Sequence, residues 1–149
     1  MTDLLAEFVP DGWIDRILAV IADNPPGHVP DPDQREDLMR SYFSTRPVLG
    51  NVWLGVSVES RRELDRLDYL RATPAALRFV SFEPLLGDLG SIDLTGINRV
   101  ITGAESGSDA RPIEMDWVRG IRDQCIAAGV PFFLKQDAKR GRKIFVART

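Results

Sequence analysis

The chain has 149 residues, of which 44% are hydrophobic and 28% are charged, and its formal net charge is −3. This composition is ordinary for a globular protein, so we expect a single domain over residues 1–149. No apolar run approaches the roughly 20 residues that cross a membrane, and no stretch is typical of a signal peptide. These features predict a cytoplasmic protein without membrane contact.

Cysteine and histidine each occur once, as Cys125 and His28. One cysteine excludes an internal disulfide and a cysteine-based metal cluster within a single chain, so we expect no metal site. Cys125 falls on the apolar face of a predicted helix and is expected to be a small core residue. His28 lies in a predicted loop without a partner motif, which favours a surface position over acid–base chemistry.

Residues 1–46 are predicted to form a helical N-terminal part. Apolar residues at helical spacing predict a helix over residues 11–23, which ends at 24–27. A second helix is predicted from the start signal at residues 31–34 to about Phe43.

Residues 47–136 are predicted to form a βα core. The expected strands are 51–58, 77–82, 98–102 and 131–135, and the expected helices begin at Ser60 and cover 115–128. Since the strands are continuous apolar runs separated by helical patterns, we expect an α/β fold with about four parallel strands. Half of a (β/α)8 barrel and a small open sheet both fit this pattern.

Polar side chains end all four predicted strands. Because the carboxyl ends of parallel strands share one edge of a sheet, these residues are expected to form one candidate ligand-binding rim. No catalytic residue is assigned among them. The rim residues are Ser57, Glu59, Ser81, Glu83, Glu105, Ser106, Lys135 and Gln136.

Each rim residue also has a purely structural interpretation. Ser57 and Ser60 suit helix caps, the latter in a capping box with Glu63, and Glu59 suits a helix N-terminus. Glu83 precedes a proline and can simply set the loop, and Gly103 suits a tight turn. Arg111 suits an anionic ligand or a surface ion pair, and no Walker or dinucleotide-binding motif is present.

The last segment, residues 137–149, is a basic tail. Within it, residues 143–147 are expected to form a short strand or an ordered arm. A basic tail can contact nucleic-acid phosphates or pair with the acidic surface of its own chain. The bases considered for nucleic-acid contact are Lys139, Arg140, Arg142 and Lys143.

Four strings in order carry a family resemblance: N-V-W-L-G-V-S-V-E-S, R-F-V-S-F-E-P-L-L-G, V-I-T-G-A-E-S-G with A-R-P, and G-V-P-F-F-L-K-Q. Over about residues 47–136 the chain resembles a phage-associated radical-SAM-like family of unknown function. Members of that family carry an upstream three-cysteine motif for an iron–sulfur cluster, and this chain resembles a truncated member without it. The resemblance implies a partial (β/α) barrel, the C-terminal half of a radical-SAM-like barrel.

In such barrels this half lines the S-adenosylmethionine and substrate cavity, which implies the same location for the rim residues. Radical chemistry needs the cluster, and this chain alone lacks the cysteines for it. We therefore expect a non-catalytic binding or interaction protein, as a homodimer or on a host or phage protein, in the host cytoplasm if phage-encoded. One alternative is an enzyme or regulator that binds S-adenosylmethionine or a nucleotide at the rim. Another is a nucleic-acid-associated protein that uses the basic tail.

Overall fold

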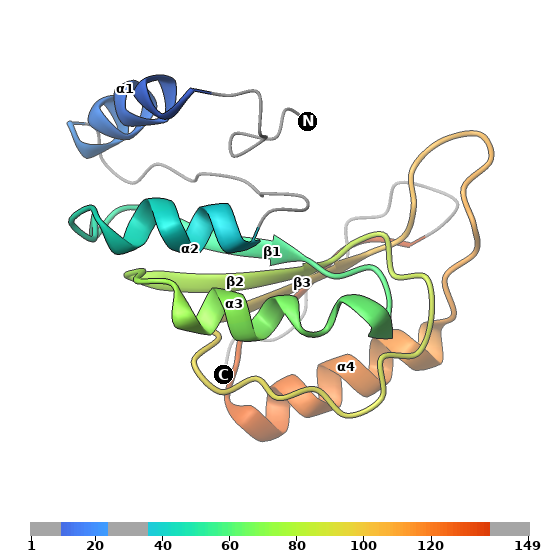
Figure 1. The fold of residues 1–149 in the computed structure, drawn as a ribbon. Coiled ribbons are helices and arrows are strands. Elements are labelled where there is room, and N and C mark those ends of the chain that lie inside the picture. Colours follow the sequence, from blue (N-terminus) through green and yellow to red (C-terminus); the bar gives the residue numbers. More distant parts are fainter. Residues whose placement is uncertain (1–9, 24–35, 138–149) are drawn as a thin grey trace.

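The structure, a computed structural model, describes residues 10–23 and 36–137. Its centre is one four-stranded parallel sheet (Figure 1) with the strand order β1-β2-β3-β4. The strands are β1 (Trp53–Ser57), β2 (Leu77–Phe82), β3 (Arg99–Gly103) and β4 (Phe132–Gln136). The predicted α/β fold with four parallel strands alternating with helices is confirmed.

Helices α3 (Arg66–Ala72) and α4 (Met115–Ala128) lie on the same side of the sheet (Figure 1). This placement follows from the strand order, since right-handed crossovers between neighbouring parallel strands put every connection on one face. α4 ends as predicted at Gly129, which takes a left-handed conformation with φ of 66°.

The sheet face toward α3 and α4 carries the core. Rows of laterally paired residues on this face, such as Val56, Val80, Val100 and Phe132, are almost fully buried. They share one apolar cluster with side chains of both helices, among them Cys125, as its helical position predicted. We call this face of the sheet the helix face and the other the open face.

The segment from Ser60 to Ala72 differs from the single helix that was predicted. The capping box is present, with the Ser60 amide donating to Glu63 Oε2 over 2.9 Å. It closes a short 3-10 helix, η1 (Arg61–Glu63), and α3 begins only at Arg66. A capping box satisfies the first amides of either kind of turn, so it marks where the helical segment starts but not how far it continues.

The connection from β2 to β3 contains no helix. Instead, Leu85, Leu89, Ile92, Leu94 and Ile97 are buried in the cluster on the helix face. This loop has an irregular backbone, and its apolar side chains cover the sheet where a crossover helix would otherwise do so.

The N-terminal helices are α1 (Asp11–Ala22) and α2 (Glu36–Ser44). Ile14 and Leu18 of α1, and Tyr42 and Phe43 of α2, belong to the same apolar cluster as the sheet. Within the described part of the chain, no helix is long and apolar enough to cross a membrane. Outside the described residues lie His28, the helix start at 31–34, the predicted arm at 143–147 and the basic tail.

Candidate functional site

The open face of the sheet brings Glu83 and Lys135 together near the carboxyl ends of the strands. Glu83 Oε1 lies 2.9 Å from Lys135 Nζ, and Oε2 accepts a hydrogen bond from Nζ over 3.1 Å. The Glu83 side chain is only 17% exposed, whereas Lys135 is 53% exposed. The pair therefore combines a largely buried carboxylate with a solvent-accessible ammonium group.

Gly103 makes this pairing possible, because the Glu83 side chain passes over it. A Cβ atom at Gly103 would lie 3.0 Å from Glu83 Cδ, closer than normal packing allows. The sequence interpretation of Gly103, a residue for a tight turn, missed this role. The signal that could have found it is a glycine between two strand ends of opposite charge.

A β-bulge sets the position of Lys135. The register between β3 and β4 runs from Thr102↔Leu134 directly to Gly103↔Gln136, so Lys135 is the extra residue of the bulge. Bulges near strand ends redirect side chains. Gln136 is held in place by the hydrogen bond from its Nε2 to the Ala104 carbonyl, over 3.0 Å.

Ser57 and Ser81 are direct neighbours in the register of β1 and β2. By strand alternation they share the open face with Gly55 and Phe79. Ser57 is buried, and its carbonyl accepts a hydrogen bond from Arg66 over 2.8 Å. The two serines therefore extend the polar floor of the rim from Glu83 toward β1.

Glu105 belongs to a separate ion pair. Its carboxylate accepts two hydrogen bonds from the Arg111 guanidinium, each over 2.7 Å, and a third from the Arg111 backbone amide over 2.9 Å. These hydrogen bonds lower the pKa of Glu105 to about 2. Of the two interpretations of Arg111, the structure has the ion pair.

The remaining rim residues are placed less centrally. The Glu59 carbonyl accepts a hydrogen bond from the Leu86 amide over 2.9 Å. The negative charge of the Glu59 side chain helps, after Glu105, to raise the pKa of Arg111. Glu59, Glu105 and Arg111 therefore lie in one region. Ser106 is exposed in the loop that follows β3. The four basic tail residues fall outside the described part of the chain.

The iron–sulfur cluster implied by the resemblance does not fit the residues present. The one thiol, Cys125, lies in the core, where burial raises its pKa to about 12. Such a cluster needs several accessible thiolates. Among residues 10–23 and 36–137, no three His, Cys, Asp or Glu side chains are grouped to hold a metal ion.

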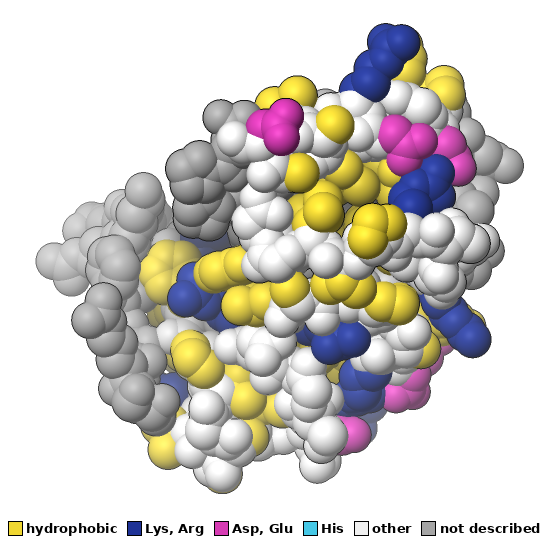
Figure 2. Space-filling view, turned by 90° about the vertical axis from the view of Figure 1, so that its left-hand side faces the viewer, with side chains coloured by type: hydrophobic (Ala, Val, Ile, Leu, Met, Phe, Trp, Pro, Cys, Tyr) yellow, Lys and Arg dark blue, Asp and Glu magenta, His cyan; other side chains and the backbone are white. Residues whose placement is uncertain are grey.

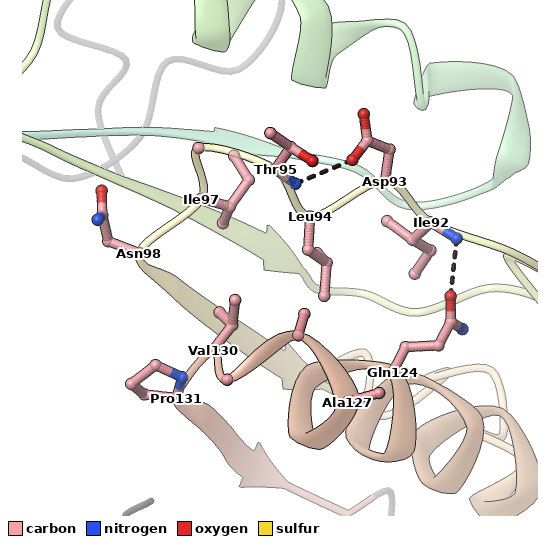
Figure 3. A pocket seen from close by; sticks show the side chains of 13 residues that line it. Ile92, Asp93, Leu94, Thr95, Ile97, Asn98, Gln124, Ala127, Val130 and Pro131 are labelled. Atoms are coloured by element: carbon pink, nitrogen blue, oxygen red, sulfur yellow. Dashed lines mark hydrogen bonds between the residues drawn. The ribbon is translucent and has the colours of Figure 1, made fainter.

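A wide, open hollow of about 820 Å³ lies at the amino ends of β3 and β4, away from the rim. Figure 3 shows it between the loop before β3 and the end of α4. Its polar groups already serve the fold: Gln124 accepts from the Ile92 amide over 2.8 Å, and Asp93 accepts from the Thr95 amide over 2.9 Å. We therefore place the candidate site at the rim, where charged groups meet across strands.

Comparison with known proteins adds a family. The sequence profile of the family described as "Protein of unknown function (DUF5131)" matches residues 1–147. The chain belongs to this family. No curated protein and no solved structure matches the chain. The match to DUF5131 extends over both N-terminal helices and all four strands, so the rim is part of the family's domain.

Proposed function

We propose that the protein is a non-catalytic interaction protein, a phage-type relative of radical-SAM-like barrels that binds another protein of host or phage. The observation that carries this proposal is an apolar stripe on the outside of α1. Trp13 is 63% exposed, Ile17 41% and Val20 64%. At positions i, i+4 and i+7 they share one side of the helix, which is the pattern of helices that dock into a partner's groove.

The chemistry of the rim supports binding over catalysis. A general acid or base works best with a pKa near the operating pH. Glu105 is held ionised by Arg111, with a pKa of about 2. The carboxylate of Glu83 is paired with Lys135.

The experiment compares wild type with a double variant, Trp13→Ala and Ile17→Ala, and with Ile126→Ala as the matched control. Ile126 is equally an exposed apolar residue, on α4. Proteins captured from host lysate are identified, purified and titrated against each variant, and sedimentation velocity tests for a homodimer. We expect a complex that weakens at least about tenfold in the double variant, the scale of two lost interface anchors, and is unchanged in the control. A monomer that binds no purified candidate, or a complex indifferent to the double variant, would contradict the proposal.

A second candidate function is binding of S-adenosylmethionine or a nucleotide at the rim, as in the barrel half that the chain resembles. The observation that favours it is the largely buried Glu83 carboxylate beside Lys135, next to the paired Ser57 and Ser81. These groups suit the hydroxyl and charged groups of such a ligand. Calorimetry with S-adenosylmethionine and with nucleotides tests it. Heat of binding in wild type that disappears in Glu83→Gln would support this function. No heat from wild type at millimolar ligand would contradict it.

A further inference from the structure

We infer that α1 is a releasable strap, held on the body of the protein by a salt-sensitive clamp centred on Arg46. This device is independent of the identity of any partner. Its basis is the uneven attachment of α1, which combines a narrow apolar contact with exposed ion pairs. α1 lies at the top of the molecule in Figure 1, and at the top of Figure 2 hydrophobic, acidic and basic side chains are exposed near one another.

The apolar contact of α1 is narrow. Of its described side chains, Ile14 and Leu18 are buried, while Trp13, Ile17 and Val20 point outward. Leu18 also lines a small cavity of about 20 Å³, whose other walls include Phe43 of α2, the connection from α2 to β1, and Leu54 of β1. A core contact that is both small and incompletely filled gains less than a close-packed one.

The polar half of the attachment is the Arg46 clamp, formed by Arg46, Tyr42, Asp15 and Asp11. The guanidinium lies 3.5 Å from the centre of the Tyr42 ring. Its Nε donates to Asp15 over 2.9 Å, its Nη2 lies 3.4 Å from Asp11, and the Tyr42 hydroxyl also donates to Asp15. Both ion pairs that the clamp makes to α1 therefore depend on Arg46, and the Tyr42 hydroxyl adds one hydrogen bond to Asp15.

The two aspartates of the clamp are open to solvent. The side chain of Asp11 is 73% exposed and that of Asp15 is 50% exposed. Exposed ion pairs are screened by salt over about 10 Å at 0.1 M ionic strength, and over shorter distances at higher ionic strength. Salt therefore weakens the polar half of the attachment and leaves the apolar contacts, which among the described side chains are those of Ile14 and Leu18, to hold α1.

Release has a direct structural consequence. A free α1 would expose both of its apolar stripes, and the cavity lined by Phe43, Val52 and Leu54 would lose the wall that Leu18 provides. A helix that is apolar on most of its sides is normally buried by something. The clamp thus decides whether α1 stays on its own domain or becomes available to another surface.

Hydrogen exchange read by mass spectrometry tests the strap on the full chain. In wild type we expect α1 amides to exchange faster than those of α4, and about threefold faster again when KCl rises from 0.02 to 0.5 M. Arg46→Met keeps an apolar stem on Tyr42 but removes the donors. It should speed α1 exchange at least about tenfold, leave α4 unchanged, and abolish the response to salt.

Arg119→Met is the matched control, because among the described residues Arg119 forms its ion pair within α4, with Asp116. It should leave α1 exchange and its salt response as in wild type. Exchange of α1 that equals α4 at both salt concentrations would overturn the inference, since α1 would then open only with the whole domain. An Arg46→Met variant whose α1 exchanges as in wild type would overturn it as well.

Discussion

Glu83 and Lys135 come from the carboxyl ends of the two strands that flank β3, and their side chains meet over β3 in an ion pair. Glu83 Oε1 lies 2.9 Å from Lys135 Nζ. Glu83 directly follows β2 and Lys135 lies in β4, and these two strands are not neighbours in the sheet. The connection exists because β3 ends in Gly103, where no side chain stands in the path of Glu83. The rim is therefore held together by three consecutive strands rather than by local loops.

Gly103→Ala tests this dependence. The new Cβ would lie 3.0 Å from Glu83 Cδ, so the glutamate has to move and the ion pair weakens. We expect the free energy of unfolding to fall by about 1–2 kcal/mol, as for other overpacked sites. In a Glu83→Ala background the same substitution should be neutral or should stabilise by up to about 1 kcal/mol. Without the clash, its remaining effect is to reduce the backbone freedom of the unfolded chain.

Urea unfolding of the four proteins in this cycle measures the coupling. Gly120→Ala is the control: it lies within α4 and a Cβ there meets nothing within 4 Å. That substitution should stabilise by about 0.5–1 kcal/mol in both backgrounds. Equal effects of Gly103→Ala with and without Glu83 would mean that the glutamate does not fill the space above the glycine.

The sequence predicted the elements well where the signal is local. The apolar runs marked the four strands, the Ser60–Glu63 pattern marked a real capping box, and Gly129 marked the end of α4. Each of these signals acts between residues a few positions apart. Local pattern did not resolve how the turn after Ser60 continues, because a 3-10 turn and an α-helix accept the same cap.

The rim was predictable as a place but not as a set of pairs. That polar residues end the strands follows from the sequence, whereas the contact of Glu83 with Lys135 spans 52 positions. It depends on the lateral order of the strands and on the bulge that makes Lys135 an extra residue. Arg111 was considered both for an anionic ligand and for a surface ion pair, and nothing in its spacing distinguished an internal partner from an external anion.

Gly55→Ala probes the open face at its apolar end. The ring of Phe79 lies directly over Gly55, and a Cβ there would come within 2.3 Å of the ring. Since Phe79 is itself buried, it has little room to retreat. We expect a loss of about 1–3 kcal/mol in the free energy of unfolding, measured by urea titration. Gly50→Ala, where a Cβ meets nothing within 4 Å, should change it by less than about 0.5 kcal/mol; similar values for both would contradict the packing of Phe79 on Gly55.

Thr102→Val addresses an unsatisfied hydroxyl on the helix face. Thr102 is fully buried, and its hydroxyl has no hydrogen-bond partner among the residues that the structure describes. Valine has the same shape without the polar atom, so the free energy of unfolding of the variant should be about 1 kcal/mol higher than that of wild type. Thr73 is equally buried, but its hydroxyl donates to the Tyr69 carbonyl over 2.8 Å. Thr73→Val should therefore lower the free energy of unfolding by about 1 kcal/mol. Thermal unfolding measures both variants, and midpoints that shift in the same direction would refute the distinction between the two hydroxyls.

Glu105 gives the stability of the chain a defined acid dependence. Hydrogen bonds from Arg111 lower its folded pKa from the ordinary 4.5 to about 2. A carboxyl whose pKa is depressed by folding contributes stability that is complete above its unfolded pKa and is lost as pH falls through the folded one. The window is therefore from about pH 4.5 down to about pH 2. Glu105→Gln removes this contribution, so the difference in unfolding midpoint between wild type and variant should be constant above pH 5 and shrink steadily below it.

Urea titrations between pH 7 and pH 3 measure that difference directly. Glu114→Gln removes the same charge from a residue whose side chain makes no capping hydrogen bond. For this control we expect a small difference that changes little between pH 5 and pH 3. Because the depression at Glu105 comes from Arg111, Arg111→Met should reproduce the flattened acid response of Glu105→Gln. An acid response of Arg111→Met that matches wild type would show that another group, and not this pair, sets the stability of the rim at low pH.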